Sequence, residues 1–184
     1  MNYQNLKLYK TPKNFRGRSS FVVQVWWFVQ ATLFSLSPQF MYGWRRFLLR
    51  MFGAKIGRKV ILRPSVTVTY PWKLSIGDFS WVGDDVVLYT LGNINIGKNT
   101  VVSQKSYLCT GLHDCSKANF PIYSKEILIE DQCWVATDVY IAPGITIGKG
   151  AIVGARSSVF HNLEPGNIYV GSPAKFLKKR ETSS

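Results

Sequence analysis

An aliphatic residue recurs at every sixth position through most of this 184-residue chain, and that period limits the folds open to it. The recurring positions are Ile56, Leu62 and Val68; Ile76, Val82 and Leu88; Ile96, Val102 and Leu108; and, after an interruption, Ile129, Val135, Ile141, Ile147, Val153 and Val159. An amphipathic helix repeats every three or four residues and a half-buried strand every two, so neither explains a period of six. The pattern predicts an all-β solenoid, in which short parallel strands stack as a β-helix of about five coils.

The spacing between coils locates one long insertion. Ile129 and Ile147 lie 18 residues apart, which is one coil of three sixes, whereas Ile96 and Ile129 lie 33 apart. The extra residues fall within the stretch 109–126, and a solenoid accepts insertions only at its corners. A long corner loop in a compact domain is usually functional. We therefore expect residues 56–164 to form the β-helix, with 109–126 as a functional loop and 165–184 as a basic C-terminal extension.

Residues 1–55 are expected to form a basic segment with two helices that cover the raw edge of the first coil. One helix should begin at Ser19 or Ser20 and is too short and too polar to span a membrane. The second should begin at a Ser37 cap with Pro38 in its first position, and Gly53 should follow its end. The expected apolar face of the second helix carries Phe40, Trp44, Phe47, Leu48 and Met51, and another face carries Arg46 and Arg50.

The positive charge is confined to one part of the chain. The formal net charge is +13, yet residues 1–77 hold thirteen lysines and arginines and no acid, while the remainder is balanced. A basic region favours an anionic partner. Nucleic acid is not the expected partner, because the chain has no recognised binding module and no aromatic platform. Two readings of the helices stay open: packing within the protein, or peripheral contact of residues 1–52 with an anionic membrane.

The cysteines and histidines argue against disulfides and metals. Three cysteines are an odd number without metal-ligand spacing, which suits a reducing compartment. The first twenty residues lack the apolar core of a secretory signal, so we expect a cytoplasmic protein. A γ-type carbonic anhydrase shares the β-helix but needs three zinc-binding histidines, and this chain has only His113 and His161. We read His161 as a surface residue in a turn of the last coil and expect no metal.

Over residues 56–175, the period of six and the exit Gly171-Ser172-Pro173-Ala174-Lys175 resemble the hexapeptide-repeat acyltransferases. The resemblance implies a left-handed coil, an exception to the right-handed rule for parallel crossovers. It also implies a homotrimer, in which the donor groove lies between two subunits, so that one chain holds half a site.

Stretches such as "RPSVTVTYPWKLSIGD", "WVGDDVVLYTLG" and "VGARSSVF" resemble the colanic acid biosynthesis acetyltransferases across nearly the whole chain. That family is assigned to O-acetylation of sugars in bacterial exopolysaccharide. The resemblance therefore implies an acetyl-CoA-dependent O-acetyltransferase for a cell-surface glycan or its lipid- or nucleotide-linked precursor, at the cytoplasmic face of the membrane. Two alternatives stay open: an O-acetyltransferase for a free small sugar or amino acid, and a non-catalytic β-helix scaffold.

His113, in the inserted loop, is the candidate general base. A neutral imidazole accepts a proton near pH 7, and a sugar hydroxyl is a poor nucleophile until it loses its proton. The segment "CTGLHD" resembles the Thr-Gly-His loop of galactoside-type acetyltransferases, with Leu112 as one additional residue. Asp84 or Asp85 is expected to bind the acceptor or orient the base, although aspartates also favour turns for their own chemistry.

The expected donor site also follows from the resemblance. Trp134 matches a tryptophan that lines the pantetheine channel, and the corner residues Ala136, Thr137, Ala155 and Arg156 would border the same groove. Lys175 and Lys178 match basic residues that meet the phosphates of coenzyme A, where lysine acts as a point charge.

Overall fold

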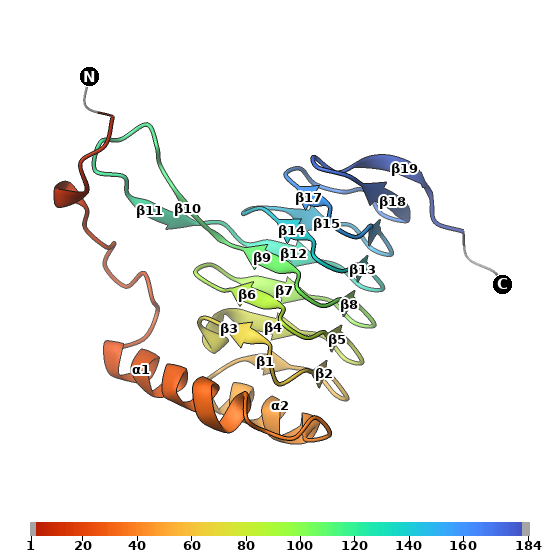
Figure 1. Cartoon of the computed structure of the whole chain (residues 1–184), viewed down its shortest axis with the longest axis horizontal. Coiled ribbons are helices and arrows are strands. Elements are labelled where there is room, and N and C mark those ends of the chain that lie inside the picture. Colours follow the sequence, from red (N-terminus) through yellow and green to blue (C-terminus); the bar gives the residue numbers. More distant parts are fainter. Residues whose placement is uncertain (1–2, 182–184) are drawn as a thin grey trace.

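The computed structural model describes residues 3–181, and Figure 1 shows a three-sided solenoid closed at one end by helices. Sheet A contains β1 (Lys55–Ile56), β4 (Leu74–Ile76), β7 (Ile94–Ile96), β12 (Ile127–Ile129) and β15 (Thr146–Ile147). Sheet B contains β2 (Ile61–Leu62), β5 (Trp81–Val82), β8 (Val101–Val102), β13 (Trp134–Val135), β16 (Ile152–Val153), β18 (Asn167–Val170) and β19 (Lys175–Lys179). Sheet C contains β3 (Thr67–Val68), β6 (Val87–Tyr89), β9 (Tyr107–Cys109), β14 (Tyr140–Ile141) and β17 (Ser158–Val159).

Each coil places one strand in each sheet, so the first coil is β1–β2–β3 and the fifth is β15–β16–β17. The predicted aliphatic positions stack in register: Ile56 pairs with Ile76, and Ile76 pairs with Ile96. Every one of these positions, from Ile56 to Val159, is at least nine-tenths buried. Burying one such side chain stabilises the fold by about 1.5–3 kcal/mol, so the column of aliphatic residues is the main source of stability. The prediction of a left-handed β-helix of about five coils is confirmed.

The glycine that often follows the aliphatic residue is required where successive coils approach closely. A Cβ on Gly97 would lie 2.5 Å from Asp131 Oδ1 and 2.6 Å from its backbone nitrogen. The same Asp131 Oδ1 accepts a 2.7 Å hydrogen bond from the backbone nitrogen of Lys98. A side chain at position 97 would therefore push the two coils apart at a corner where they are joined.

The N-terminal segment contains η1 (Leu6–Leu8), α1 (Ser20–Val29), the π-helical turn η2 (Gln30–Phe34) and α2 (Tyr42–Met51), and η3 (Pro71–Lys73) lies in the first coil-to-coil turn. As predicted, Ser19 caps α1, because its side chain accepts a 3.4 Å hydrogen bond from the backbone nitrogen of Val22. Trp26 and Phe34 belong to the same buried cluster as the solenoid core. The first helix therefore closes the open end of the β-helix, as Figure 1 shows.

The predicted start and apolar face of the second helix are wrong. The helix begins at Tyr42 and not after Ser37, whose hydroxyl donates instead to Phe34 O at 2.6 Å and accepts from Arg45. On α2 the buried side chains are Arg45, Leu48 and Leu49. Of the predicted face, Leu48 is buried and Trp44 is partly buried against the core, whereas Phe40, Phe47 and Met51 are exposed. Gly53 follows the helix in the left-handed region, at φ +93°, as predicted.

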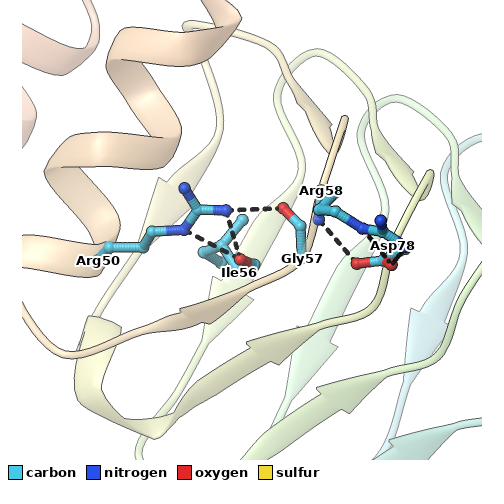
Figure 2. Close-up of polar contacts among 5 residues, drawn as sticks. All are labelled: Arg50, Ile56, Gly57, Arg58 and Asp78. Carbon is cyan, nitrogen blue, oxygen red and sulfur yellow. Dashed lines mark hydrogen bonds and ion pairs between the residues drawn. The ribbon is translucent and has the colours of Figure 1, made fainter.

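The arginines of α2 satisfy carbonyl groups at the free edge of the first coil. Figure 2 shows Arg50, whose Nε and Nη2 donate to Ile56 O at 3.0 and 2.7 Å, and whose Nη2 also donates to Gly57 O at 2.9 Å. Arg46 Nη1 donates to Val60 O at 2.8 Å. A β-helix leaves unpaired carbonyls at its first coil, and these guanidinium groups supply the missing donors.

Three more side chains complete this edge. Arg45, fully buried, donates from Nε to Leu62 O at 2.6 Å. Trp26 Nε1 donates to Val68 O at 2.8 Å, and the backbone nitrogen of Val68 donates to Gln30 Oε1 at 2.7 Å. The helices thus cap the first coil on all three sides by polar contacts as well as by apolar packing.

The far end of the solenoid is closed by an antiparallel pair. Strand β18 lies parallel to β16, and β19 returns antiparallel beside β18. Across residues 3–181, no helix combines the length and the apolar character needed to cross a bilayer.

Candidate functional site

The inserted loop folds as a β-hairpin. Strands β10 (Gly111–His113) and β11 (Ile122–Ser124) pair antiparallel, with His113 opposite Ile122. Figure 1 shows the hairpin projecting from the solenoid on the side opposite the β5, β8 and β13 strands of sheet B. The additional Leu112 is accommodated as the central residue of β10, opposite Tyr123. The hairpin therefore carries His113 away from the core on a paired strand.

His113 is oriented by Phe120, which lies in the turn of its own hairpin just before β11. Its Nδ1 lies 2.9 Å from Phe120 O, and its ring stacks on the Phe120 ring with centroids 4.3 Å apart and planes 9° apart. A carbonyl oxygen only accepts, so in the neutral imidazole Nδ1 carries the hydrogen and Nε2 holds the free lone pair. The ring itself is exposed. This arrangement presents Nε2 as a proton acceptor.

The N-terminal arm, residues 3–18, runs beside the hairpin (Figure 1). The backbone nitrogen of Asn5 donates to Ala118 O at 2.7 Å, and the Tyr9 ring lies 6.3 Å from the His113 ring, centroid to centroid. The arm is held on the solenoid by Lys73, whose Nζ donates to Phe15 O at 2.8 Å. Nothing in the sequence pattern pointed to this contact between the arm and the loop.

Two other carboxylates near the loop are engaged elsewhere. Asp114 accepts from Ser116 Oγ and pairs with Lys117 at 3.2 Å, and the hydrogen bond from the Ser116 hydroxyl is the first cause that lowers the pKa of Asp114. Glu126 accepts from the side-chain amides of Asn93 and Asn95 at 3.2 and 3.0 Å. Neither carboxylate has a contact with His113 that would orient it.

Four of the predicted donor-site residues line a single cavity of about 430 Å³ on the outer side of sheet B. These are Trp134, Ala136, Thr137 and Ala155. The Trp134 side chain is 47% exposed, and its Nε1 donates to Ser103 Oγ at 3.0 Å, which holds the indole against the cavity. A half-exposed tryptophan over an apolar cavity can bind the aliphatic and amide groups of an extended ligand.

A second cavity of about 700 Å³ adjoins the first and is lined by Asp84 and Asp85 together with Arg63 and Trp81. Ser103 and Gln104 line both cavities, so the two form one groove that crosses several coils. These two shared polar residues were missed by sequence reasoning, because they occupy ordinary turn positions with no motif of their own.

The two aspartates of the groove play different roles. Asp84 Oδ2 accepts from Arg63 Nε at 2.8 Å, and Asp84 Oδ1 accepts from Ser65 Oγ at 3.2 Å. That hydrogen bond to Asp84 is the main cause that raises the pKa of Arg63. Asp85 occupies the left-handed region at φ +57°, and its backbone nitrogen donates to Ser65 Oγ at 2.9 Å. Asp84 is therefore already paired, whereas Asp85 is a corner residue at the groove's edge.

Arg156, predicted to border the groove, and Lys175 and Lys178, predicted to meet the phosphates, line neither cavity. Arg156 stands at a left-handed corner, φ +58°, with its guanidinium 3.6 Å from the Asp138 carboxylate. Lys175 and Lys178 are exposed on β19, and Lys178 pairs with Ile168 of β18. Since β18 lies beside β16, which borders the Trp134 cavity, the β19 lysines are two strands, or about 10 Å, beyond it.

One chain does not bring His113 together with the groove. The groove lies on sheet B, whereas the hairpin leaves sheet C after β9 and projects from the other side of the solenoid (Figure 1). His161 is exposed in the last coil, as predicted. Over residues 3–181, no three His, Cys, Asp or Glu side chains are grouped to hold a metal ion.

Comparisons with known proteins agree with the fold and the repeat. The family model for the bacterial transferase hexapeptide, six repeats, matches residues 126–161. The chain is 57% identical over 177 residues to an Escherichia coli K12 protein named as a colanic acid biosynthesis acetyltransferase, WcaF, covering 96% of this chain and 97% of the relative.

Solved structures share the architecture at lower identity. A maltose O-acetyltransferase from Clostridium difficile superposes with a TM-score of 0.80 at 24% identity, covering 89% of this chain and 90% of the other. A hexapeptide-repeat acetyltransferase from Vibrio cholerae in complex with acetyl-coenzyme A superposes with a TM-score of 0.80 at 22% identity, covering 90% of this chain and 92% of the other. At these identities the likeness establishes the fold.

Proposed function

The chain belongs to the hexapeptide-repeat acyltransferases, in the group of the colanic acid biosynthesis acetyltransferases, and we propose that it O-acetylates a sugar of a bacterial exopolysaccharide. The acetyl group would come from acetyl-CoA, and the acceptor would be the polymer or its lipid- or nucleotide-linked precursor. Identity of 57% over nearly the full length of both chains supports this assignment.

The observation that carries the chemistry is the orientation of His113. With Nδ1 donating to Phe120 O, the free Nε2 takes the proton of the acceptor hydroxyl while that oxygen bonds to the thioester carbonyl carbon. His113, now an imidazolium, returns the proton to the departing thiolate of coenzyme A as the carbon–sulfur bond breaks. The products are the O-acetyl sugar and free coenzyme A, and the imidazole is neutral again.

The groove on sheet B is the proposed donor site. Trp134, Ala136, Thr137 and Ala155 would contact the pantetheine arm, which is a narrow chain of methylene and amide groups suited to an apolar cavity. Lys175 and Lys178 lie beyond the cavity toward the end of the sheet, and their positive charges would meet the phosphates. Arg156 follows Ala155 at the corner and would border the same groove.

A homotrimer would complete the site. Within one chain His113 and the groove face opposite sides, so a donor in the groove of one chain would meet the His113 hairpin of a neighbouring copy. In that arrangement Asp85, at the edge of the groove and free of the Arg63 pairing, is the better of the two aspartates to contact an acceptor. Asp84 would act through Arg63 as a positioning residue.

The proposed location is the cytoplasm, with peripheral contact between residues 1–52 and the inner face of the cytoplasmic membrane. An acceptor assembled on a lipid carrier would be held at that surface. The apolar and basic character of the N-terminal segment supports the contact.

Calorimetric titration with acetyl-CoA at low and high salt, combined with acetyl transfer to candidate glycan acceptors, tests the function. We expect saturable binding that survives salt and weakens at least about tenfold in Trp134→Ala, because the indole lines the apolar cavity. His113→Asn should bind acetyl-CoA normally and lose about 10²–10⁴-fold in transfer rate. The matched control is His161→Asn, the other exposed histidine, which should retain full rate.

Binding that vanishes at high salt, or that is unchanged in Trp134→Ala, would overturn the donor site. It would favour the non-catalytic scaffold, with the basic segment merely attracting phosphates. Robust transfer to a free monosaccharide or an amino acid, and none to a nucleotide- or lipid-linked sugar, would instead favour an O-acetyltransferase for a free small acceptor.

A further inference from the structure

Helix α1 is apolar on the side that faces away from the solenoid. Its sequence, SFVVQVWWFV, contains no charged residue. Val23 and Trp26 are fully buried against the protein, whereas Phe21 and Phe28 are 77% and 67% exposed. At 100° per residue, Phe21, Val25 and Phe28 form one stripe directly opposite the buried pair. A helix of a soluble protein normally turns polar residues outward at these positions.

Further exposed apolar side chains lie on α1 and beyond it. We name as the apolar cap face the exposed side chains of Phe21, Val25, Trp27, Phe28, Leu33, Leu36, Phe40, Phe47 and Met51. They come from α1, η2, α2 and the connection between the helices, at the end of the solenoid that the helices close (Figure 1). Scattered single apolar residues are normal on protein surfaces, but a set this large on one capping element marks an interaction site.

The helix arginines do not form a basic membrane-binding face. Arg45, Arg46 and Arg50 turn toward the first coil and donate to its carbonyls, so their guanidinium groups are committed within the protein. The exposed basic side chains nearest to the start of α1 are Lys13 and Arg18. The outward face of the cap is thus apolar, with positive charge at its margin.

The charge of the segment argues against a second copy as the covering partner. Residues 3–77 contain no acidic side chain, so two caps meeting face to face would bring bases together with no carboxylate to pair them. Like-charge contacts of this kind disfavour association. An anionic bilayer has an apolar interior and a negatively charged surface. The interior matches the apolar side chains of the cap, and the surface matches the positive charge at its margin.

We infer that the apolar cap face inserts into the interfacial layer of an anionic lipid bilayer and docks the solenoid end-on. The inference specifies the surface and the mode of the membrane contact within the proposed function. The His113 hairpin leaves the third coil, two strand spacings or about 10 Å above the first coil. End-on docking would therefore hold the solenoid upright on the membrane, with the His113 hairpin two coils from the bilayer and directed away from the cap (Figure 1).

Vesicle flotation of the full-length protein tests this inference. The probes are phosphatidylcholine vesicles with and without about one-third phosphatidylglycerol, at low and high salt. We expect flotation with the anionic vesicles and partial retention of it at high salt, because apolar insertion is not screened. Phe21→Glu combined with Phe28→Glu should lower the partition coefficient about tenfold or more, since two rings that would enter the bilayer are replaced by charges. The control is Phe176→Glu, which replaces a 57% exposed ring on β19 at the far end.

Three results would overturn the inference: no flotation of the wild-type chain, equal flotation of the double variant and the Phe176 control, or complete loss of flotation at high salt. A changed sedimentation coefficient in the double variant would also do so, because it would show that another copy covers the face. Acetyl-CoA binding by the same variants is measured in parallel. Since Phe21 and Phe28 line neither cavity of the groove, normal donor binding without flotation would contradict the docking inference and leave the proposed function intact.

Discussion

Replacing Arg45 by methionine should strongly destabilise the protein. The guanidinium is fully buried and makes four hydrogen bonds: Nε to Leu62 O at 2.6 Å, Nη1 to Ser37 Oγ at 2.8 Å and to Pro38 O at 2.9 Å, and Nη2 to Gln39 O at 2.5 Å. Burial is the main cause that lowers the pKa of this arginine, so the charge already bears a desolvation cost that these four acceptors offset.

The magnitude follows from the groups left without partners. Methionine keeps the packing of the aliphatic stem but leaves Leu62 O at the sealed edge of the first coil, where an unpaired carbonyl costs about 1–3 kcal/mol. The carbonyls of Pro38 and Gln39 lie in the more accessible connection and should cost about 1 kcal/mol each. The expected loss is therefore about 3–5 kcal/mol, or a melting temperature lower by roughly 10 °C for a chain of this size.

Urea unfolding followed by far-ultraviolet circular dichroism, at one fixed protein concentration, would measure this loss. Concentration is held constant because the stability of an oligomer depends on it. The matched control is Arg58→Met: Arg58 is 80% exposed and pairs with Asp78 at 3.0 Å on the surface, as Figure 2 shows, so its removal should have a far smaller effect. Equal unfolding midpoints for the two variants would refute the idea that α2 stabilises the solenoid by capping its edge.

Two further predictions concern other parts of the molecule. Burial raises the pKa of the Cys133 thiol from 9 to about 11, so the folded state holds this proton more tightly than the unfolded state. Stability should therefore be undiminished below pH 9 and fall between pH 9 and 11, and Cys133→Ala should show a shallower fall in urea midpoints over that range; parallel pH profiles would contradict it. Tyr9→Ala should lower the transfer rate about tenfold without changing acetyl-CoA binding, because the arm positions the His113 hairpin. The control is Tyr123→Ala, a half-exposed tyrosine on β11, and equal rates for both variants would dismiss a positioning role for the arm.

The fold could be read from the sequence because a β-helix repeats one local rule. Every coil buries three aliphatic residues, one in each of three columns. Ile56, Ile76 and Ile96 therefore share one environment, and all fifteen positions follow the same rule. The position of the loop followed from the same count, since an insertion changes the spacing between columns. The cap of α1 by Ser19 was predictable because capping depends on residues only three apart.

The start of α2 could not be read in this way. Ser37 and Pro38 carry a standard helix-start signal, but the Ser37 hydroxyl is used by Arg45, and the Pro38 carbonyl accepts from the same guanidinium. That acceptor set exists only because the chain passes beneath the first coil. The helix therefore begins later, at Tyr42, and its inward face carries an arginine where amphipathic pattern alone would place an apolar residue.

Some features of the candidate site could likewise be predicted from the sequence, and others could not. The sequence by itself determined the period, the place of the loop, and the residue types that suit base chemistry and donor binding, since each depends on short-range spacing. Only the tertiary structure decided that Phe120 O orients His113, that Ser103 and Gln104 join two cavities into one groove, and that the groove and the hairpin face opposite sides. It also decided that the helix arginines turn inward while Phe21 and Phe28 turn outward. The physical reason is that unpaired edge carbonyls, and the direction in which each corner projects, arise only once the coils have stacked.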